Sequence, residues 1–482
     1  MHIQIAFRIL GSLLMIFSLT MLPPILVSWL FADGVSIIFI DTFALTFSAG
    51  AVLFGLFRKH HQEMRTKDGF LITFLFYMAL GCFGAIPMVQ ESGINLSWPD
   101  ALFESFSGLT TTGATVITGI DDLPASILFY RQQLQWLGGM GIIVLAVAIL
   151  PMLGIGGMQL YRAETPGPLK DSKLTPRIKQ TAVALWSIYI GLTVACAAAY
   201  WIAGMSLFDA ICHSFSTIAI GGFSTHDASI GYFDSVAIEM VAIFFMALAG
   251  INFGLHFFGW RERTVLHYLR DDEVFFYLLL LVIGTVIVTA GLVSFGTYEM
   301  PTAFRFAAFE VVSIFTTTGF ATADFSTWPN MLPYLIFLGA FTGACAGSTG
   351  GGMKVVRVFL LYLQGVRELN RLVHPRAIYS IKLGRKALPD KVVEAVWGFF
   401  SAYALVFIII MLALMGTGMD NITAFSATAA CLNNLGPGLG DVASHYGAIT
   451  DGAKWLLTIA MVFGRLEIFT LLVLFTPTFW RG

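Results

Sequence analysis

The stretch ALFESFSGLTTTGA at residues 101–114 decides the fold expected for this chain, because three similar stretches follow it. They are AICHSFSTIAIGGF at 210–223, AAFEVVSIFTTTGF at 307–320 and AFSATAACLNNLGP at 424–437. Each stretch begins with Ala and carries Gly twelve residues later. A short pattern that recurs at a similar spacing is typical of an internal repeat. The sequence therefore predicts four related structural units.

The composition indicates an integral membrane protein. Hydrophobic residues make up 57% of the 482 positions and charged residues only 12%, too apolar a mixture for one water-soluble core. A formal net charge of -2 gives no reason to expect a nucleic-acid partner. The five cysteines show no C-x-x-C spacing and are interpreted as packing residues, not as metal ligands or disulfide partners.

Ten apolar runs have about the 20 residues needed to cross ~30 Å of hydrocarbon. They lie near 7–30, 37–57, 70–89, 128–152, 181–203, 236–258, 275–296, 331–363, 393–416 and 454–478. Four shorter apolar segments lie between some of these runs, at 99–112, 208–221, 304–318 and 422–435. Because each is too short to span and ends in a Gly-containing turn, we expect re-entrant half-helices.

The positions of Lys and Arg predict the orientation. Four connections, 58–68, 161–180, 259–273 and 354–391, together hold 21 of the 27 Lys and Arg residues. The positive-inside rule places them in the cytoplasm. The alternate connections are acidic, contain only Arg305 among basic residues and are expected to face outward with all four short segments. Both chain ends are then cytoplasmic.

The expected fold is an all-α integral membrane protein in which four pseudo-repeats of helix, re-entrant pore loop and helix surround a central pore. Two N-terminal transmembrane helices precede the repeats. The predicted units are 1–68 for the helix pair, then 69–179, 180–272, 273–391 and 392–482 for the repeats. The third repeat includes an intramembrane loop at 343–353.

The repeated turn suits the transport of a cation. A cation that enters a low-dielectric layer must exchange its hydration water for other oxygens, and four extended segments can supply rings of backbone carbonyls. Gly permits the backbone angles that turn carbonyls inward, and Thr hydroxyls can add ligands. The alternative is that Thr, Ala and Gly simply allow close helix packing in the membrane. Recurrence at four equivalent places on one side favours the pore.

Several longer motifs carry a resemblance to a known family. They are LTTTGAT at 109–115, AIGGFSTHD at 219–227, FTTTGFATAD at 315–324, NNLGPGLGD at 433–441, GACAGSTGGGMK at 343–354 and GRLEIFTLLVLF at 464–475. With them the chain resembles the TrkH-type subunits of the Trk/Ktr/HKT superfamily of potassium transporters. The resemblance covers the chain from the leading pair of spans to the last helix.

The resemblance implies K+ uptake across a bacterial inner membrane by a homodimer in which each subunit has its own pore. It implies a K+-binding selectivity filter made by Thr111, Thr112, Gly113, Ile220, Gly221, Gly222, Thr317, Thr318, Gly319, Asn434, Leu435 and Gly436. The fourth segment departs from the Thr-rich pattern, with Asn433, Asn434 and Pro437. We therefore expect its side of the filter to differ from the other three.

A gate is expected within the membrane. The apolar run at 331–363 is interrupted by Gly343, Gly347, Gly350, Gly351 and Gly352, and each Gly disfavours a helix by about 1 kcal/mol. Irregular backbone at membrane depth needs protein or a wet cavity around it, which places the loop just below the filter. The family resemblance treats this loop as the gate. A phosphate-binding loop is disfavoured, because Met353 interrupts the GK[ST] requirement.

Arg465 lies inside the last apolar run, where an unpartnered charge is costly. One interpretation is a structural ion pair, for example with Glu467. The other, favoured by the resemblance, places Arg465 in the pore beneath the filter, bonded to the glycine-rich loop and hindering permeation. Lys354 and Arg357 are interpreted as interfacial snorkelling residues, and His213 and His226 as structural residues.

The resemblance implies a cytosolic TrkA-type ring with nucleotide-binding domains as regulatory partner. K+ is the expected cargo, with Rb+ and Na+ as further permeant ions, and no covalent cofactor is expected. A symporter that couples K+ to H+ or Na+ is the alternative, with Glu239, Glu310 and Glu467 as the main intramembrane carboxylates. An intramembrane enzyme is disfavoured, because the sequence has no HExxH motif or nucleophile constellation.

Overall fold

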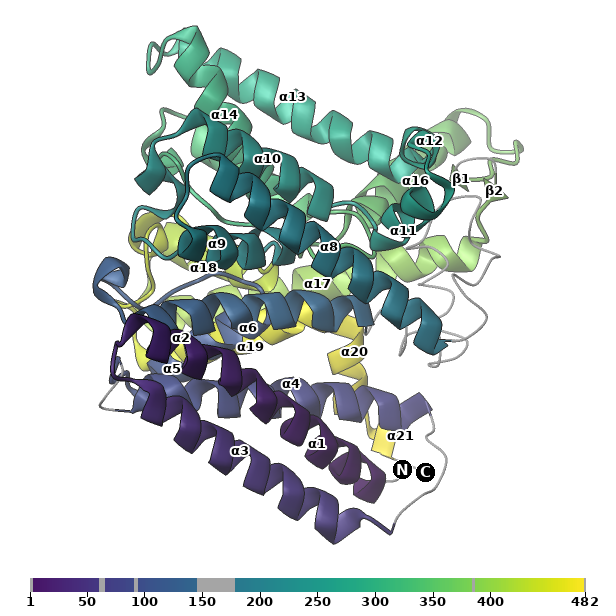
Figure 1. Ribbon diagram of the computed structural model, residues 1–482. Coiled ribbons are helices and arrows are strands. Elements are labelled where there is room, and N and C mark those ends of the chain that lie inside the picture. The colour runs from purple at the N-terminus through teal and green to yellow at the C-terminus, as the bar shows by residue number, and fades with distance from the viewer. Residues whose placement is uncertain (1–2, 60–65, 91–93, 145–177, 384–385, 481–482) are drawn as a thin grey trace.

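The computed structural model describes residues 3–59, 66–90, 94–144, 178–383 and 386–480. Its regular elements are almost all helical (Figure 1). They are α1 (Ile3–Ser18), η1 (Leu19–Met21), α2 (Leu22–Phe31), α3 (Ser36–Phe57), α4 (Thr66–Val89), α5 (Trp98–Leu109), η2 (Ile120–Asp122), α6 (Ala125–Val144), α8 (Ile178–Ile202), α9 (Leu207–Ala219), η5 (Ser229–Phe233), α10 (Val236–Ala249), α11 (Phe253–Glu262), α12 (Leu266–Leu269), α13 (Asp272–Ser294), α14 (Met300–Phe315), η6 (Phe325–Thr327), α15 (Leu332–Thr342), α16 (Val355–Val373), β1 (Lys382–Leu383), β2 (Lys386–Ala387), α17 (Asp390–Gly416), α18 (Asn421–Leu432), η7 (Gly440–Val442), α19 (Asp451–Arg465), α20 (Ile468–Leu472), η8 (Val473–Phe475) and α21 (Pro477–Trp480). The two short strands pair as an antiparallel hairpin.

The expected membrane spans are largely present. Six helical stretches are long and apolar enough to cross a membrane: Ile3–Phe31, Ser36–Phe57, Asp68–Val89, Val183–Ile202, Asp272–Ser294 and Asp390–Gly416. Two bent helix pairs raise the number among the described residues to eight if each pair is one span. The end of the expected run 128–152 and most of the connection 161–180 lie outside the described residues. The all-α, multi-pass membrane architecture is confirmed.

The four short helices also agree with the expectation. They are α5, α9, α14 and α18, and each is followed by an irregular turn. Polar caps start three of them: the side chains of Ser97, Ser206 and Asp420 accept backbone N–H groups of the first turn. Such caps satisfy N–H groups that have no partner within the helix. Pro301 near the start of α14 needs no such partner.

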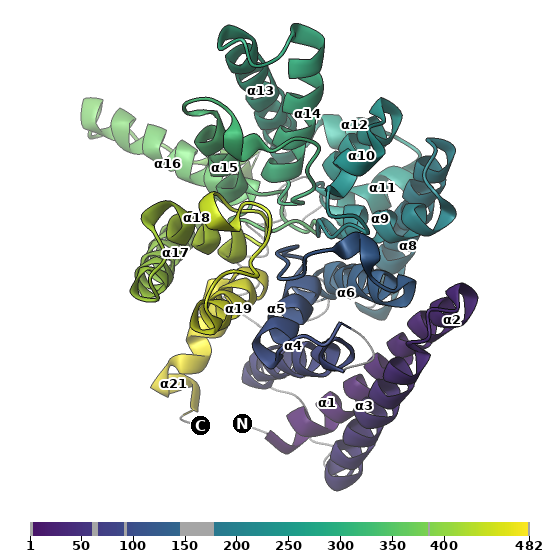
Figure 2. The same ribbon diagram turned by 90° about the vertical axis from the view of Figure 1, so that its left-hand side faces the viewer.

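Each of these four helices packs against the helix before it and the helix after it. The sets are α4, α5 and α6; α8, α9 and α10; α13, α14 and α15; and α17, α18 and α19. Neighbouring sets touch through α6 and α9, α10 and α14, α15 and α18, and finally α19 and α5, so the chain closes a ring. Figure 2 shows these sets around a common centre, with α1 to α3 outside the ring.

Two spans expected to be continuous are bent, which corrects the expectation. The helix pair at 236–258 turns by 97° between α10 and α11, and the last span turns by 110° between α19 and α20. At the first break, the Asn252 side chain accepts the Gly254 N–H and starts a new helix. At the second, Glu467 has a φ of 62°, which an α-helix cannot contain. Arg465 therefore ends α19 and does not lie inside a long helix.

The expected interruption of the run at 331–363 is present. Helix α15 ends at Thr342, and α16 begins at Val355. We call residues 343–354 between them the glycine loop.

Candidate functional site

The residues expected to form the filter adopt one backbone shape four times. We call Thr111–Gly113, Ile220–Gly222, Thr317–Gly319 and Asn434–Gly436 the filter segments. The first and last residue of each have positive φ, with 53° and 79° at Thr111 and Gly113 and similar pairs in the other three. Three of the first residues are Thr or Ile, side chains that rarely adopt this region. An uncommon conformation shared by four segments indicates a common structural requirement.

The same hydrogen bond holds each filter segment to its own short helix. The N–H of the middle residue donates to the carbonyl five positions earlier, with a donor–acceptor distance of 2.8 Å in all four segments. These middle residues are Thr112, Gly221, Thr318 and Leu435. Among the described residues, the carbonyls of Thr112 and Thr318 accept no hydrogen bond. The arrangement thus leaves backbone oxygens free to bind something else.

The four segments meet in a closed ring. A Cβ added to Gly113 would fall within 3.0 Å of the Gly221 carbonyl oxygen of the second segment. Gly222 faces the Thr318 oxygen of the third segment in the same way, Gly319 faces Leu435 of the fourth, and Gly436 faces Thr112 of the first. Only Gly fits at these positions, because any side chain would meet a neighbouring carbonyl. The structure therefore brings all twelve expected filter residues together in one place.

The side chains around the ring are not fourfold symmetric. The Thr110 and Thr112 hydroxyls lie 2.7 Å apart, and Thr316 and Thr318 repeat this contact in the third segment. In the fourth segment, the Asn434 amide nitrogen donates to the Thr112 hydroxyl at 3.0 Å and to the Met461 carbonyl at 3.0 Å. The departure of the fourth segment from the Thr-rich pattern thus supplies a bridge to the first segment and to α19.

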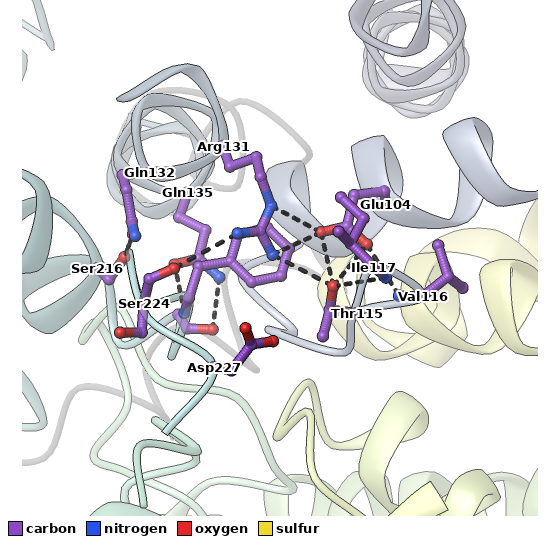
Figure 3. A network of polar contacts seen from close by, with 12 residues as sticks. Glu104, Thr115, Val116, Ile117, Arg131, Gln132, Gln135, Ser216, Ser224 and Asp227 are labelled. Carbon is purple, nitrogen blue, oxygen red and sulfur yellow. Dashed lines mark hydrogen bonds and ion pairs between the residues drawn. The ribbon is translucent and has the colours of Figure 1, made fainter. Parts of the chain in front are cut away.

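Polar residues of α6 support the ring and were missed from the sequence. Figure 3 shows Arg131 and Glu104 facing each other, with Arg131 nitrogens 2.8 and 2.9 Å from one carboxylate oxygen. Gln135 donates to the Gly221 carbonyl at 2.5 Å and accepts the Phe223 N–H at 3.1 Å. Both α6 side chains are buried. The signal that could have found them is two polar residues one helical turn apart in an apolar run.

The glycine loop lies against the ring. The Gly351 N–H donates to the Thr317 hydroxyl at 2.7 Å, and the Gly352 N–H donates to the Asn433 carbonyl at 3.0 Å. The Thr349 hydroxyl donates to the carbonyl of Ile218 at 2.8 Å. The loop therefore contacts the second, third and fourth repeats.

Arg465 joins the glycine loop to the first repeat. One terminal nitrogen of its guanidinium donates to the Thr349 carbonyl at 3.1 Å, and the other donates to the Gly138 carbonyl of α6 at 2.8 Å. The side chain is buried, and no ion pair involves it among the described residues. The arrangement matches the expected contact with the loop rather than a pair with Glu467.

Lys354 and Arg357 are not interfacial, which corrects the sequence interpretation. Lys354 donates to the Gly350 carbonyl of the glycine loop. Arg357 is 3% exposed, lies over the Phe399 ring and pairs with Glu467 at 3.0 Å. The reason is the pair of chain breaks, which brings Arg357 of α16 and Glu467 of the α19–α20 break together inside the protein. Helix periodicity alone does not contain this information.

The connections beside the filter carry an ion-pair cluster around His226. Its ring nitrogens lie 2.5 Å from Asp121 and 3.6 Å from Asp209, and its ring stacks on Tyr232. Burial lowers the pKa of His226, but hydrogen bonds and charge from Asp209 and Asp121 outweigh burial and raise the pKa above its usual value. Asp227 accepts the Gly119 N–H at 3.1 Å. These contacts join the first and second repeats.

His213 is buried on α9, where its two ring nitrogens lie 2.9 Å from the Asp209 carbonyl and the Ser224 hydroxyl. Its structural role stays a prediction. In the described part of the chain, no group of three or more His, Cys, Asp or Glu side chains is placed to hold a metal ion. The oxygens gathered at the ring are carbonyls and hydroxyls, which suit hard monovalent cations.

Comparisons with known proteins agree with this architecture. The family model TrkH, described as a cation transport protein, matches residues 36–481. The "Trk system potassium uptake protein TrkH" of Halomonas elongata is 58% identical over 481 residues, with 100% of both chains covered. The protein of the same name from Escherichia coli K12 is 56% identical over 482 residues, also with full coverage. A crystal structure of the potassium transporter TrkH from Vibrio parahaemolyticus superposes with a TM-score of 0.93 at 55% identity, covering 100% of both chains.

Proposed function

The chain belongs to the TrkH family of cation transport proteins, and on this premise we propose that it takes up K+ through a gated pore centred on the four filter segments. Relatives of more than half identity bear the name of potassium uptake proteins, which supports K+ as the cargo. An oxygen-lined ring within a membrane helix bundle also suits ion transport rather than enzymatic catalysis.

The closed ring of filter segments is the observation that carries this proposal. Four carbonyl-bearing turns lie against one another, and each repeat glycine permits the next carbonyl to approach. Unbonded backbone oxygens can replace the hydration shell of a dehydrated cation. Thr111, Thr112, Thr317 and Thr318 also supply hydroxyls beside these oxygens. The twelve filter residues are the proposed K+ ligands.

The helix dipoles favour a cation at the ring. Each filter segment follows the C-terminal end of a short helix, α5, α9, α14 or α18. The C-terminal end of a helix carries about half a negative elementary charge. Four such ends around one ring attract cations and repel anions. Low dielectric at membrane depth makes this attraction stronger than it would be in water.

The glycine loop and Arg465 are the proposed gate. The gate residues are Gly343, Gly347, Gly350, Gly351, Gly352 and Arg465. Arg465 is a buried cation bonded to the loop through Thr349, and a fixed positive charge near a cation path hinders conduction. Opening then consists of moving the loop and the guanidinium away from the ring. The bonds from Gly351 and Gly352 to the filter side would be exchanged for others in that step.

Regulation belongs to a second polypeptide in this proposal. Helix α16 follows the glycine loop directly, and Figure 2 shows its far end extending away from the ring. That end exposes Leu369, Leu372 and Val373 beside Arg371. A cytosolic TrkA-type ring that binds nucleotides and docks there could pull on the loop. A homodimer in a bacterial inner membrane, with both chain ends in the cytoplasm, completes the proposal.

The test is 86Rb+ uptake into proteoliposomes that contain the purified protein alone, driven by a K+ gradient. A passive pore predicts uptake that stops when the K+ concentration is made equal on both sides and that ignores imposed H+ or Na+ gradients. Uptake that follows an H+ or Na+ gradient would instead establish the symporter.

A matched pair of glycine variants ties the flux to the ring. Gly222→Ala places a Cβ against the Thr318 carbonyl, whereas Gly191→Ala in α8 meets nothing within 4 Å. We expect the first to abolish uptake and the second to keep it. Equal uptake by both variants would overturn the assignment of the pore.

A further inference from the structure

The fourth position of each aligned segment has a feature that neither the filter nor the gate explains. Counting from the Ala that opens each segment, this position holds Glu104, His213, Glu310 and Ala427. The first three are polar, lie on short helices and have no exposed surface. Burying polar groups inside a membrane protein is costly unless each makes specific bonds. Their bonds therefore indicate why the chain retains them.

In the first and third repeats, the Glu carboxylate accepts hydrogen bonds from the backbone just after the repeat glycine. Glu104 accepts the Val116 N–H at 3.0 Å and the Thr115 hydroxyl at 3.0 Å. Glu310 accepts the N–H groups of Thr322 at 2.8 Å and Ala323 at 3.1 Å. Each carboxylate thus links the short helix before the glycine to the irregular segment after the glycine by hydrogen bonds.

The second and fourth repeats make weaker versions of the same tie. His213 Nε2 lies 2.9 Å from the Ser224 hydroxyl, which comes two residues after Gly222. Ala427 has no polar group, but Ser426, one position earlier, accepts the Leu439 N–H at 2.9 Å and donates to the Leu439 carbonyl at 3.0 Å. All four repeats therefore clamp the chain just beyond the filter, with different chemical groups.

The two carboxylates differ in their electrostatics. Glu104 is balanced by Arg131, with nitrogens 2.8 and 2.9 Å from its Oε1 (Figure 3). Glu310 has no basic partner at such a distance among the described residues, and its Oε2 makes no hydrogen bond there. Its Oε1 accepts the two backbone N–H groups and, at 3.2 Å, the Thr322 hydroxyl. Glu310 is therefore the residue at which this clamp can be tested without releasing a buried arginine.

We propose that Glu310 is a positioning residue that sets cation selectivity by fixing the chain on the far side of Gly319, with Glu104 and His213 in the same role for their repeats. The inference rests on the proposed K+ uptake through the ring. Na+ is smaller than K+ and is favoured when oxygens can close in around it. The hydrogen bonds beyond each repeat glycine hold the turn in place and so oppose the closing of the ring oxygens around Na+. A selective binding site needs its groups held within about 0.5 Å.

The experiment measures 86Rb+ and 22Na+ uptake in proteoliposomes, each divided by the amount of protein that elutes as a folded species. Glu310→Ala removes both backbone bonds and the bond from the Thr322 hydroxyl, and we expect the Rb+ to Na+ ratio to fall at least about fivefold, the factor for the loss of a single buried hydrogen bond. Glu310→Gln keeps an amide oxygen as acceptor, so we expect most of the ratio to be retained. Glu310→Asp keeps the carboxylate but shortens its reach, so the ratio falls.

Glu239→Ala is the matched control. Glu239 is equally buried, but it bonds Arg305 at 2.7 Å and, among the residues that the structure describes, none of the segments that follow a repeat glycine. Its loss can lower the yield of folded protein, and we expect the Rb+ to Na+ ratio to stay at the wild-type value. A merely structural role of Glu310 would give the same pattern as this control.

The outcomes separate the inference from the proposed function. Unchanged ratios in Glu310→Ala and Glu310→Asp, with both fluxes intact or reduced together, would overturn the positioning role. If Glu310→Ala does not fold, Glu310→Asp decides alone. Absence of Rb+ uptake by the wild-type protein would instead reject the proposed function, before any variant is compared.

Discussion

The filter segments and the glycine loop are both glycine-rich backbone inside the membrane bundle, yet they are supported in opposite ways. In the filter, each middle N–H bonds a carbonyl of its own short helix. In the loop, Ser348 bonds the Cys345 carbonyl locally, but other N–H groups bond distant elements: Cys345 to the Gly250 carbonyl, Ala346 to Glu273, and Gly351 to the Thr317 hydroxyl. The filter therefore holds its shape locally, whereas the loop depends on its neighbours.

This difference suits the two proposed roles. A selective ring must keep its oxygens in place while ions pass, so bonds within one helix and its following turn are an advantage. A gate must have a second position, and bonds between elements can be exchanged when those elements shift. We expect substitutions to act accordingly, lowering flux in the filter and raising it in the loop.

The sharpest test of the comparison applies one substitution to both regions. In Gly113→Ala, the new Cβ meets the Gly221 carbonyl and φ is +79°, whereas in Gly351→Ala it meets the Asn433 carbonyl without positive φ. We expect Gly113→Ala to abolish 86Rb+ uptake, because the ring cannot close. Gly351→Ala should push the loop away from the ring and raise uptake. Loss of uptake in both variants would show that the loop is part of the filter and not a gate.

Removal of the buried guanidinium should give the next largest effect. Arg465→Ala deletes the bonds to Thr349 and Gly138 and removes a positive charge near the ring. We expect uptake by the protein alone to rise about tenfold, equivalent to ~1.4 kcal/mol of barrier. Arg371→Ala, which removes an exposed arginine of α16, is the control and should leave uptake unchanged. A fall in uptake with normal protein yield would identify Arg465 as a support of the pore.

A smaller effect is expected where the two regions touch. The Thr317 hydroxyl accepts the Gly351 N–H at 2.7 Å, whereas the equivalent Thr111 hydroxyl has no partner among the described residues. Both substitutions remove a filter hydroxyl, but only Thr317→Val also frees the loop from a bond worth about 1 kcal/mol, so its uptake should exceed that of Thr111→Val about fivefold. Thr111→Val serves as the matched variant and should keep the loop in place. Equal flux changes in both would mean that the hydroxyls act on the ion and not on the loop.

The least effect is expected from pH at the cluster beside the filter. Because the pKa of His226 is raised, its pairing adds stability that is fully present below the usual value of 6.5 and is lost as pH rises through the raised value. Burial raises the pKa of Asp121, but the hydrogen bond and charge of His226 outweigh it and lower the pKa below its usual value. The contribution of the Asp121 carboxylate to stability therefore persists until strongly acidic pH. Asp121 is 44% exposed, which limits the pair to about 0.5 kcal/mol. Melting temperatures of wild type and His226→Gln should differ at pH 6 and converge at pH 9.

The repeats, the re-entrant helices and the interrupted third repeat could be predicted from the sequence because they depend on apolar length and on glycine spacing. The bends could not. Gly250 and Asn252 are local signals of the break, but Gly also occurs inside membrane helices, and the Gly250 carbonyl is paired by Cys345 of the distant glycine loop. A long-range partner decides the break, and a single sequence does not reveal that partner.

The same limit explains the errors on charged residues. Lys354 and Arg357 follow a loop in the sequence and resemble interfacial residues, but the bend between α19 and α20 brings Glu467 to pair with Arg357. For Arg465, the cost of a buried charge predicted a special site, and only the structure identifies Thr349 and Gly138 as its partners. Whether the twelve filter residues bind K+ stays a prediction.

The closure of the ring has a consequence for how the protein is made. Asn434 bonds Thr112 across 322 residues, and Gly436 faces the same residue's carbonyl, so the first repeat meets its final neighbour only when the fourth has been synthesised. Contacts between such distant parts of a chain form late in folding. A ribosome-bound chain that has inserted three repeats holds an arc of oxygens with one side open and no enclosed conduit. A chain that ends before the fourth repeat therefore lacks one side of the ring, and we expect such a chain not to conduct K+.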